Sequence, residues 1–350
     1  MNDYDLTIDK SNMYKSIIDF PTHIKESFNF FKKNSSLKPN LKDGISSIMM
    51  LGMGGSAITG LLIKEILKND LDIPIAVNQG YDIPKWVNKY TLVIACSYSG
   101  NTEETLNALE KCKQKKAKII GFTTGGALFK IVQKYNYDYV LIPKGLQPRA
   151  AIGYSFPLIL MLFNEINLID ESFIKNLKDS FAHLFKNGKK YSHRTEKNKA
   201  YYIASKIYDK NPIIYAEEGV FNIIGYRFKC QLVENSKVLA FNNAVPEMNH
   251  NEIEAYTTKV NIKNNFVVIW INDSIYHDQN KKRIEIVSNI YENKIEEQLF
   301  LEVKSKNNKN KILKYLNYIH LVDWISYHAA ILNKIDPSII PNINQLKKTL

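Results

Sequence analysis

Short apolar segments of strand length alternate with longer segments of helical period along most of this chain. Strands joined through helical crossovers pair in parallel, so this alternation predicts α/β sheets with helices on both faces. In the first half, strands are expected at 46–53, 73–79, 91–97, 117–124 and 138–143. In the second half, they are expected at 212–217, 237–242, 265–272 and 296–303.

Helices are expected between these strands and at both ends of the chain. Apolar side chains at helical spacing predict an amphipathic helix over 10–33. The other expected helices are 56–67, 102–115, 127–135, one or more within 154–188, 199–209, 220–233, a helix near 250–256, 278–292 and 311–334. Beyond Pro337 we expect only a short tail.

The polar segment around 186–199 is the best candidate for a domain boundary, because the strand–helix pattern restarts after it. We therefore expect an N-terminal domain at 1–185, a second domain at 195–310, and a C-terminal helix and tail at 311–350. The segment IMMLGMGGSAITGLL also aligns by eye with PIIYAEEGVFNIIGY. Both predict a strand, a tight turn and a helix, which indicates a duplicated α/β unit.

Composition narrows the cellular setting. The three cysteines are far apart, which favours a reducing compartment over a disulfide framework or a zinc site. The longest apolar run, 156–163, is too short to span a bilayer, and the polar N-terminus does not resemble a signal peptide. The net charge of +12 comes from scattered lysines. We expect a soluble cytoplasmic protein that binds neither membrane nor nucleic acid.

The first candidate site is the glycine-rich turn Gly52–Ala57, between an expected strand and helix. Glycines admit a ligand close to the backbone, and a helix N-terminus presents unpaired N–H groups. The turn could contact a sugar or phosphate, form a structural tight turn, or hold a dinucleotide. The dinucleotide alternative requires an acidic residue at the end of the second strand, where this chain has Val77–Gly80.

The second candidate site is Ser97–Glu104, again between a strand and a helix. Three hydroxyls within six residues converge on a helix start, which suits a phosphate group. The alternative is a capping box with Asn101 as N-cap and Glu104 at the third helical position. One cap does not need three hydroxyls, so the pattern favours phosphate. There is no GxxxxGK[ST] segment of a nucleotide-hydrolysing loop.

A glycine–serine turn followed by SYSGNTEE resembles the sugar-isomerase domains that bind phosphosugars. Four further segments occur in order: QPRA with GYS, ENSK, PEMNHNEI and a closing DP with LK. Together they resemble the bifunctional phosphoglucose/phosphomannose isomerases along the whole chain. The resemblance implies two sugar-isomerase domains, each a parallel sheet flanked by helices, with a C-terminal helix and tail. It also implies a sugar phosphate substrate and no metal or other cofactor.

By this resemblance, Ser97, Ser99 and Thr102 would hold the phosphate, and Gly55 and Ser56 would line the site. Aldose–ketose isomerisation moves a proton between C1 and C2 through a cis-enediolate. It needs a phosphate anchor, a base, a group that opens the sugar ring and a cation near the developing oxyanion.

The same resemblance assigns the catalytic groups. Glu234 would be the proton-shuttling base, and Arg149 would stabilise the enediolate. His250 would assist ring opening and would come from the partner subunit of a homodimer. Lys347 would act near the ring oxygen, although the neighbouring Lys348 could take its place.

From the residues alone, other interpretations stay open. Glu234 could pair with Lys237 at a helix end, and Arg149 could cap a strand end. His250 could be a loop histidine or a metal ligand with Glu247 and Glu252, although the dense His/Glu spacing of a metal site is missing.

Glu247 could replace Glu234 as the base, since a helical turn would put it on the same face as His250. Ser338 could place a hydroxyl near C2.

For the whole protein, the main alternative is a non-catalytic phosphosugar-binding regulator, which would need neither Glu234 nor His250. Another is a different enzyme on the same fold, such as an etherase or glucosamine-6-phosphate synthase. The synthase would need an N-terminal nucleophilic cysteine, which this chain lacks.

Overall fold

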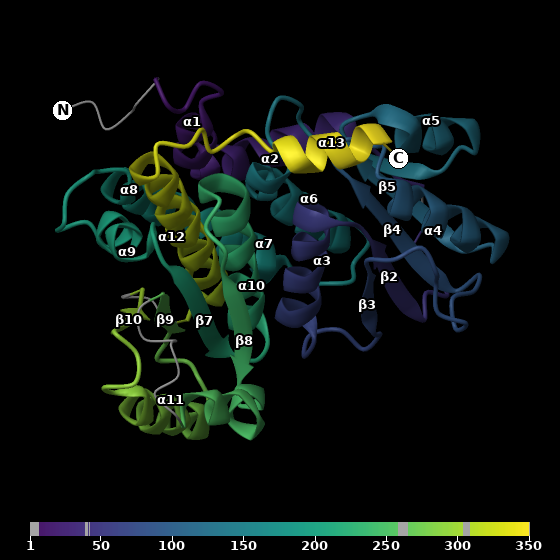
Figure 1. Cartoon of the computed structure of the whole chain (residues 1–350). Coiled ribbons are helices and arrows are strands. Elements are labelled where there is room, and N and C mark those ends of the chain that lie inside the picture. The colour runs from purple at the N-terminus through teal and green to yellow at the C-terminus, as the bar shows by residue number, and fades with distance from the viewer. Residues whose placement is uncertain (1–6, 39–40, 42, 258–264, 304–308, 350) are drawn as a thin grey trace. The chain divides into compact units, whose positions relative to one another are not determined.

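The computed structural model describes residues 7–38, 41, 43–257, 265–303 and 309–349. They form two compact units. The first unit is Asp19–Phe181, and the second joins the segment that ends at Ile18 to the segment that begins at Ala182. Each unit is an α/β sheet with helices packed on it (Figure 1).

The sheet of the first unit has six strands in the order β1-β6-β5-β4-β2-β3. Five are mutually parallel, as expected for strands joined through helices, and β1 is antiparallel to β6. The strands are β1 (Ser35–Ser36), β2 (Ser47–Leu51), β3 (Ile75–Asn78), β4 (Thr91–Ser97), β5 (Lys118–Thr123) and β6 (Asp138–Leu141).

Helices cover both faces of this sheet, with α3 and α6 on one side and α4 and α5 on the other (Figure 1). On the second side, Val93 and Ala95 of β4 pack with Leu109 of α4 and Val132 of α5. The helices of this unit are α2 (Phe20–Asn34), α3 (Gly54–Leu67), α4 (Glu103–Gln114), α5 (Gly126–Lys134), the short η1 (Pro148–Ala150), α6 (Ile152–Glu165) and α7 (Glu171–Asp179).

The sheet of the second unit has four parallel strands in the order β10-β9-β7-β8. The strands are β7 (Asn211–Glu217), β8 (Phe241–Val245), β9 (Phe266–Ile271) and β10 (Glu297–Leu301). Its helical segments are α1 (Met13–Ile18), α8 (Phe181–Tyr191), α9 (Lys199–Ile207), α10 (Val220–Gln231), the π-turn η2 (Leu232–Ser236), η3 (Glu247–His250), η4 (Glu252–Tyr256), α11 (Asp278–Tyr291), α12 (Lys311–Leu332) and α13 (Pro341–Thr349).

The long helix α12 forms the core of the second unit, with almost all of its residues buried against neighbours such as α9 and α10. One of its buried charged groups, the carboxylate of Asp323, is paired. Arg227 of α10 donates two hydrogen bonds to Asp323 of α12, at 3.0 and 2.7 Å, and Gln231 donates a third at 2.8 Å. None of the helices in the described ranges is long and apolar enough to cross a membrane.

The predicted α/β fold with parallel sheets is confirmed, with four local corrections. The expected helix over 10–33 is two helices, α1 and α2, separated at Asp19. Pro21 explains the break, because proline has no N–H to continue a helix and is tolerated only in a first turn. The expected strand at 237–242 begins later, at Phe241, because the chain first leaves η2 through Lys237 in a left-handed conformation (φ 57°).

The third correction concerns the end of the chain, where the expected tail contains helix α13. The expected helix near 250–256 consists of two short 3₁₀ segments, η3 and η4.

Candidate active site

The first unit has one place where its strand connections diverge. Helix α3 links β2 to β3, whereas α4 and α5 lead from β4 to β5 and β6 on the other side. The carboxyl ends of β2 and β4 therefore border the crevice where open α/β sheets bind ligands. The glycine turn follows β2 and the hydroxyl-rich loop follows β4, so both predicted sites meet at this crevice.

The glycine turn brings Arg149 to the start of α3. Gly54 begins the helix with φ +52°, and a β-carbon on Gly55 would lie 2.9 Å from the carbonyl oxygen of Pro148 and 3.3 Å from the Cα of Arg149. Only glycine permits this approach of η1. Arg149 is 4% exposed, so the turn places a nearly buried cation beside a helix N-terminus. Ser56, in the first turn of α3, is half-buried.

The three predicted phosphate ligands surround the start of α4. The hydroxyls of Ser97 and Thr102 are hydrogen-bonded at 2.8 Å. Ser99 is exposed, and its Oγ accepts from the Asn101 N–H at 3.2 Å. Thr102 is the N-cap of α4, and its side chain makes no capping hydrogen bond, while its N–H donates to the Oγ of Ser97 at 3.4 Å. The first N–H groups of α4 and the nearby hydroxyls therefore form a site with the chemistry to bind an anion.

The capping-box alternative is wrong for Asn101. Its side-chain oxygen accepts at 2.9 Å from the N–H of Ala127, in the first turn of α5, and not from α4. Two glycines make this possible. Gly100 and Gly126 have φ of +73° and +71°, and a β-carbon on Gly100 would overlap the carbonyl oxygen of Gly125. Because the two loops approach closely, the Asn101 side chain caps α5, and the N-cap residue of α4 makes no side-chain cap.

Sequence reasoning did not assign a role to Tyr98. Its hydroxyl donates to the carbonyl of Pro143 at 2.9 Å and accepts from the N–H of Leu146 at 3.0 Å. These bonds attach the loop that leads to Arg149 to the hydroxyl-rich loop. The only sequence signal was the position of Tyr98 between two serines of the motif.

The dinucleotide alternative is not supported by the end of β3. Asn78 is the last residue of that strand, and its side-chain amide donates to the carbonyl of Gly80 at 2.8 Å. This places an amide that closes a local turn where a ribose would require a carboxylate.

In the second unit, Glu234 lies at the centre of the π-turn η2, where helix α10 ends. Such turns insert one residue into a helix and frequently occur at functional sites. Asn235 donates to Ser326 of α12 at 2.9 Å, and Ser236 donates to the carbonyl of Leu232 at 2.7 Å. These bonds anchor the turn, while Glu234 itself is half-buried.

The second unit also has a point where its connections diverge, between β7 and β9. Here Lys314 donates to Asp273 at 2.6 Å, with both side chains at most 2% exposed, and Tyr318 donates to the same carboxylate at 3.0 Å. A buried ion pair therefore occupies the position that corresponds to the anion site of the first unit.

His250 is exposed at the end of η3, and no hydrogen bond joins its imidazole to a described residue. Glu247 is exposed and accepts from Asn251 at 3.0 Å. Glu252 accepts from Tyr215 at 2.7 Å and from Asn243 at 2.5 Å. Among the residues with described positions, no group of three or more His, Cys, Asp or Glu is arranged to hold a metal ion.

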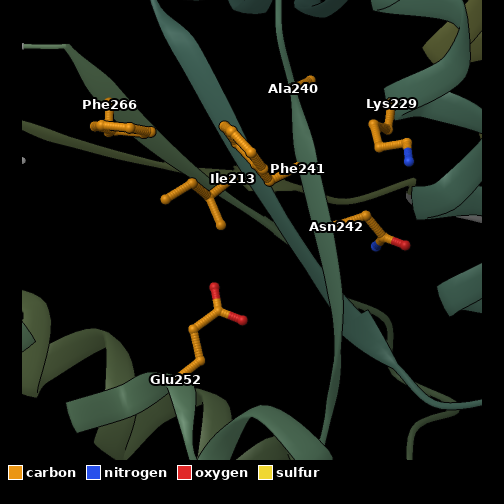
Figure 2. A pocket seen from close by; sticks show the side chains of 7 residues that line it. All are labelled: Ile213, Lys229, Ala240, Phe241, Asn242, Glu252 and Phe266. Atoms are coloured by element: carbon orange, nitrogen blue, oxygen red, sulfur yellow. The ribbon is translucent and has the colours of Figure 1, made fainter. Parts of the chain in front are cut away.

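A pocket of about 670 Å³ in the second unit is not a candidate for the active site. It lies near the starts of the strands, where Phe241 and Phe266 line it, with the Glu252 carboxylate pointing toward them (Figure 2). Ligands of parallel sheets bind at the opposite, carboxyl ends of the strands.

Lys347 and Lys348 lie on α13, which has no buried residue. The side chains of both lysines form no hydrogen bond with the described part of the chain. Ser338, upstream of this helix, is only 3% exposed. The structure thus places Glu234, His250 and Lys347 on three separate elements of the second unit.

Comparison with known proteins identifies the family. Residues 44–164 match the model of the SIS domain, and residues 196–350 match the bacterial phospho-glucose isomerase C-terminal SIS domain. A bifunctional phosphoglucose/phosphomannose isomerase of Caldicellulosiruptor bescii is 36% identical over 97% of this chain and 98% of its own length. The chain belongs to the bifunctional phosphoglucose/phosphomannose isomerase family.

The chain is also similar to proteins with other names. A D-glucosamine-6-phosphate 4-epimerase of Sulfolobus acidocaldarius is 33% identical over 64% of this chain and 68% of its own length. The solved structure of tagatose-6-phosphate ketose/aldose isomerase from Escherichia coli superposes with a TM-score of 0.70 at 15% identity, covering 94% of this chain and 96% of that one. At that identity the likeness shows a shared fold alone. Membership in the bifunctional phosphoglucose/phosphomannose isomerase family confirms the resemblance inferred from the motifs.

Proposed function

We propose that this chain is a metal-independent isomerase that interconverts fructose 6-phosphate with glucose 6-phosphate and mannose 6-phosphate through a cis-enediolate. The observation that carries the proposal is the start of α4, which has no side-chain cap and is surrounded by the hydroxyls of Ser97, Ser99 and Thr102. This arrangement matches a sugar phosphate, and family membership supports isomerisation as the reaction.

The catalytic roles that we propose are those implied by the family resemblance, and the chemistry of each side chain suits its role. Glu234 acts as the base that moves the proton between C1 and C2, and its anchored turn supports this role. Arg149, a permanent cation near the anion site, faces the developing enediolate oxygens. His250 handles protons during ring opening. Lys347 acts near the ring oxygen, with Lys348 as the alternative.

The test is a coupled assay with fructose 6-phosphate in EDTA that follows glucose 6-phosphate and mannose 6-phosphate separately. Glu234→Gln should abolish both activities, while the matched control Glu247→Gln should retain them. Loss of activity in Glu247→Gln alone would move the base to Glu247. Production of glucose 6-phosphate alone would show that mannose 6-phosphate is not a substrate.

The same assay includes D-glucosamine 6-phosphate, because one relative is named for that substrate. Turnover of the amino sugar without turnover of fructose 6-phosphate would overturn the proposal. Binding of fructose 6-phosphate with no turnover would favour the phosphosugar-binding regulator.

We also propose a cytoplasmic homodimer in which His250 enters the active site of the partner. An exposed imidazole with no hydrogen bond to the described residues supports this arrangement. Co-expression of Glu234→Gln with His250→Ala tests it. If the two groups act across subunits, mixed dimers contain one site with both groups intact and regain activity. If they act within one subunit, mixed dimers stay inactive.

A further inference from the structure

One lysine connects the turn that carries Glu234 to the chain segment that leads into α13. The ammonium of Lys237 donates at 2.6 Å to the backbone oxygen of Glu234 and at 2.7 Å to the backbone oxygen of Ile339. Ile339 lies two residues before α13, and the carbonyl of the next residue, Ile340, accepts from the N–H of Asn344 in that helix. The lysine thus joins two segments separated by 102 residues.

The backbone of Lys237 also takes part in closing the π-turn. Lys237 has φ 57°, and its N–H donates to the carbonyl of Leu232, which closes η2. A left-handed conformation is uncommon for a residue with a β-carbon, so the surrounding structure must hold it there. Hydrogen bonds from an ammonium to carbonyls are stronger than those between neutral groups.

Helix α13 depends on this connection more than the π-turn does. The turn is also held by Asn235 through Ser326 and by Ser236 through Leu232. By contrast, α13 has no buried residue, so little apolar packing fixes its position. Removal of the Lys237 ammonium should therefore release the start of α13 while the turn keeps its other anchors.

We propose that Lys237 is a positioning residue that holds the segment carrying Lys347 in register with the turn carrying Glu234. This inference rests on the proposed function, in which both residues act on the sugar. Loss of the Lys237 ammonium should slow the chemical step and leave substrate binding unchanged, because the proposed phosphate ligands are residues of the first unit. Small displacements of positioned groups can cost about 100-fold in rate.

The test compares Lys237→Met, Lys237→Arg and the control Lys334→Met. Lys334 is also exposed and left-handed (φ 56°), and its ammonium forms no hydrogen bond with the described residues. For fructose 6-phosphate, Lys237→Met should lower kcat by about 10- to 100-fold and change KM by less than about twofold. Lys237→Arg should recover most of kcat, and Lys334→Met should match the parent.

A double-mutant cycle separates positioning from a general structural role. If Lys237 acts through Lys347, Lys237→Met should reduce kcat little further in a Lys347→Ala background. The same cycle with Lys348→Ala covers the neighbouring lysine. Effects that multiply in both backgrounds, a loss confined to KM, or an equal loss in Lys334→Met would overturn the proposal.

A second measurement does not need activity. Amide hydrogen exchange of peptides covering 338–349 should be about 10-fold faster or more in Lys237→Met than in the parent and in Lys334→Met. Unchanged exchange would overturn the connection even in an active enzyme. An inactive parent with faster exchange in Lys237→Met would instead reject the proposed function and retain the connection.

Discussion

Gly55 and Pro148 approach each other so closely that a β-carbon on Gly55 would lie 2.9 Å from the Pro148 carbonyl oxygen. This contact places Arg149 beside the start of α3. Gly55→Ala should therefore displace η1 and lower kcat/KM by about 10-fold or more, since misplaced catalytic groups are costly. Gly80→Ala is the matched control, because nothing lies within 4 Å of its would-be β-carbon. Full activity of Gly55→Ala in the coupled assay would contradict the predicted role of this contact.

The hydroxyl of Ser97 gives a second prediction. Ser97 is 1% exposed and hydrogen-bonded to Thr102 at the start of α4. A hydrogen bond to a charged group contributes about 1.5–3 kcal/mol, so Ser97→Ala should raise KM for fructose 6-phosphate by roughly 10- to 100-fold. Inhibition by inorganic phosphate should weaken in parallel. Ser205→Ala, at a half-buried serine whose hydroxyl donates to the carbonyl of Tyr202 within its own helix, is the control. A drop in kcat with both phosphate-dependent constants unchanged would argue against a phosphate ligand.

The raised pKa values of the cysteine thiols predict slow reaction with thiol reagents near neutral pH. Burial raises the pKa of the Cys96 and Cys112 thiols to about 12, and it also raises the pKa of Cys230. Because the thiolate is the reactive form, all three should react slowly with a disulfide reagent at pH 8. Cys230, which is half-buried, should react first. In denaturant, three thiols should react rapidly. Fast labelling of Cys96 or Cys112 in the native protein would show that the core of the first unit opens readily.

The buried ion pair between Arg227 and Asp323 predicts that removing the arginine alone destabilises the protein more than changing both residues together. Burial raises the pKa of Asp323 despite its bonds from Arg227 and Gln231, so desolvation outweighs their attraction. Arg227→Met alone would leave a buried carboxylate without its cation and should cost about 3–5 kcal/mol of unfolding free energy.

The double variant Arg227→Met with Asp323→Asn keeps an acceptor for Gln231 and should recover a large part of that loss. Denaturant unfolding measures both variants. Equal destabilisation of the single and double variants would show that the shape of the Arg227 side chain matters more than the charge it neutralises.

Most strands and helices of this protein could be predicted from local pattern. The expected strands at 91–97 and 212–217 match β4 and β7 within one residue, because a continuous apolar segment between turn residues suits a strand buried on both faces. The expected segment 237–242 failed for a reason that its own residues do not reveal. The π-turn before it extends the helical region, and Lys237 must close that turn before β8 can begin.

The candidate phosphate site was predictable in residue type but not in its hydrogen bonds. Three hydroxyls beside a helix start are visible in the sequence, whereas the partner of Asn101 depends on Gly126 approaching Ser99 from another loop. The role of Tyr98 likewise depends on Pro143 and Leu146, which are distant in the chain.

The sequence by itself determined the alternation of strands and helices, the two α/β sheets and the motifs that mark the family, because these depend on side-chain period and local turn chemistry. Only the tertiary structure decided that α4 lacks a side-chain cap, that Gly55 admits Arg149 to the start of α3, and that Lys237 joins Glu234 to Ile339. Each of these depends on distances between backbone groups far apart in the chain, and those distances are set by how the packed elements meet.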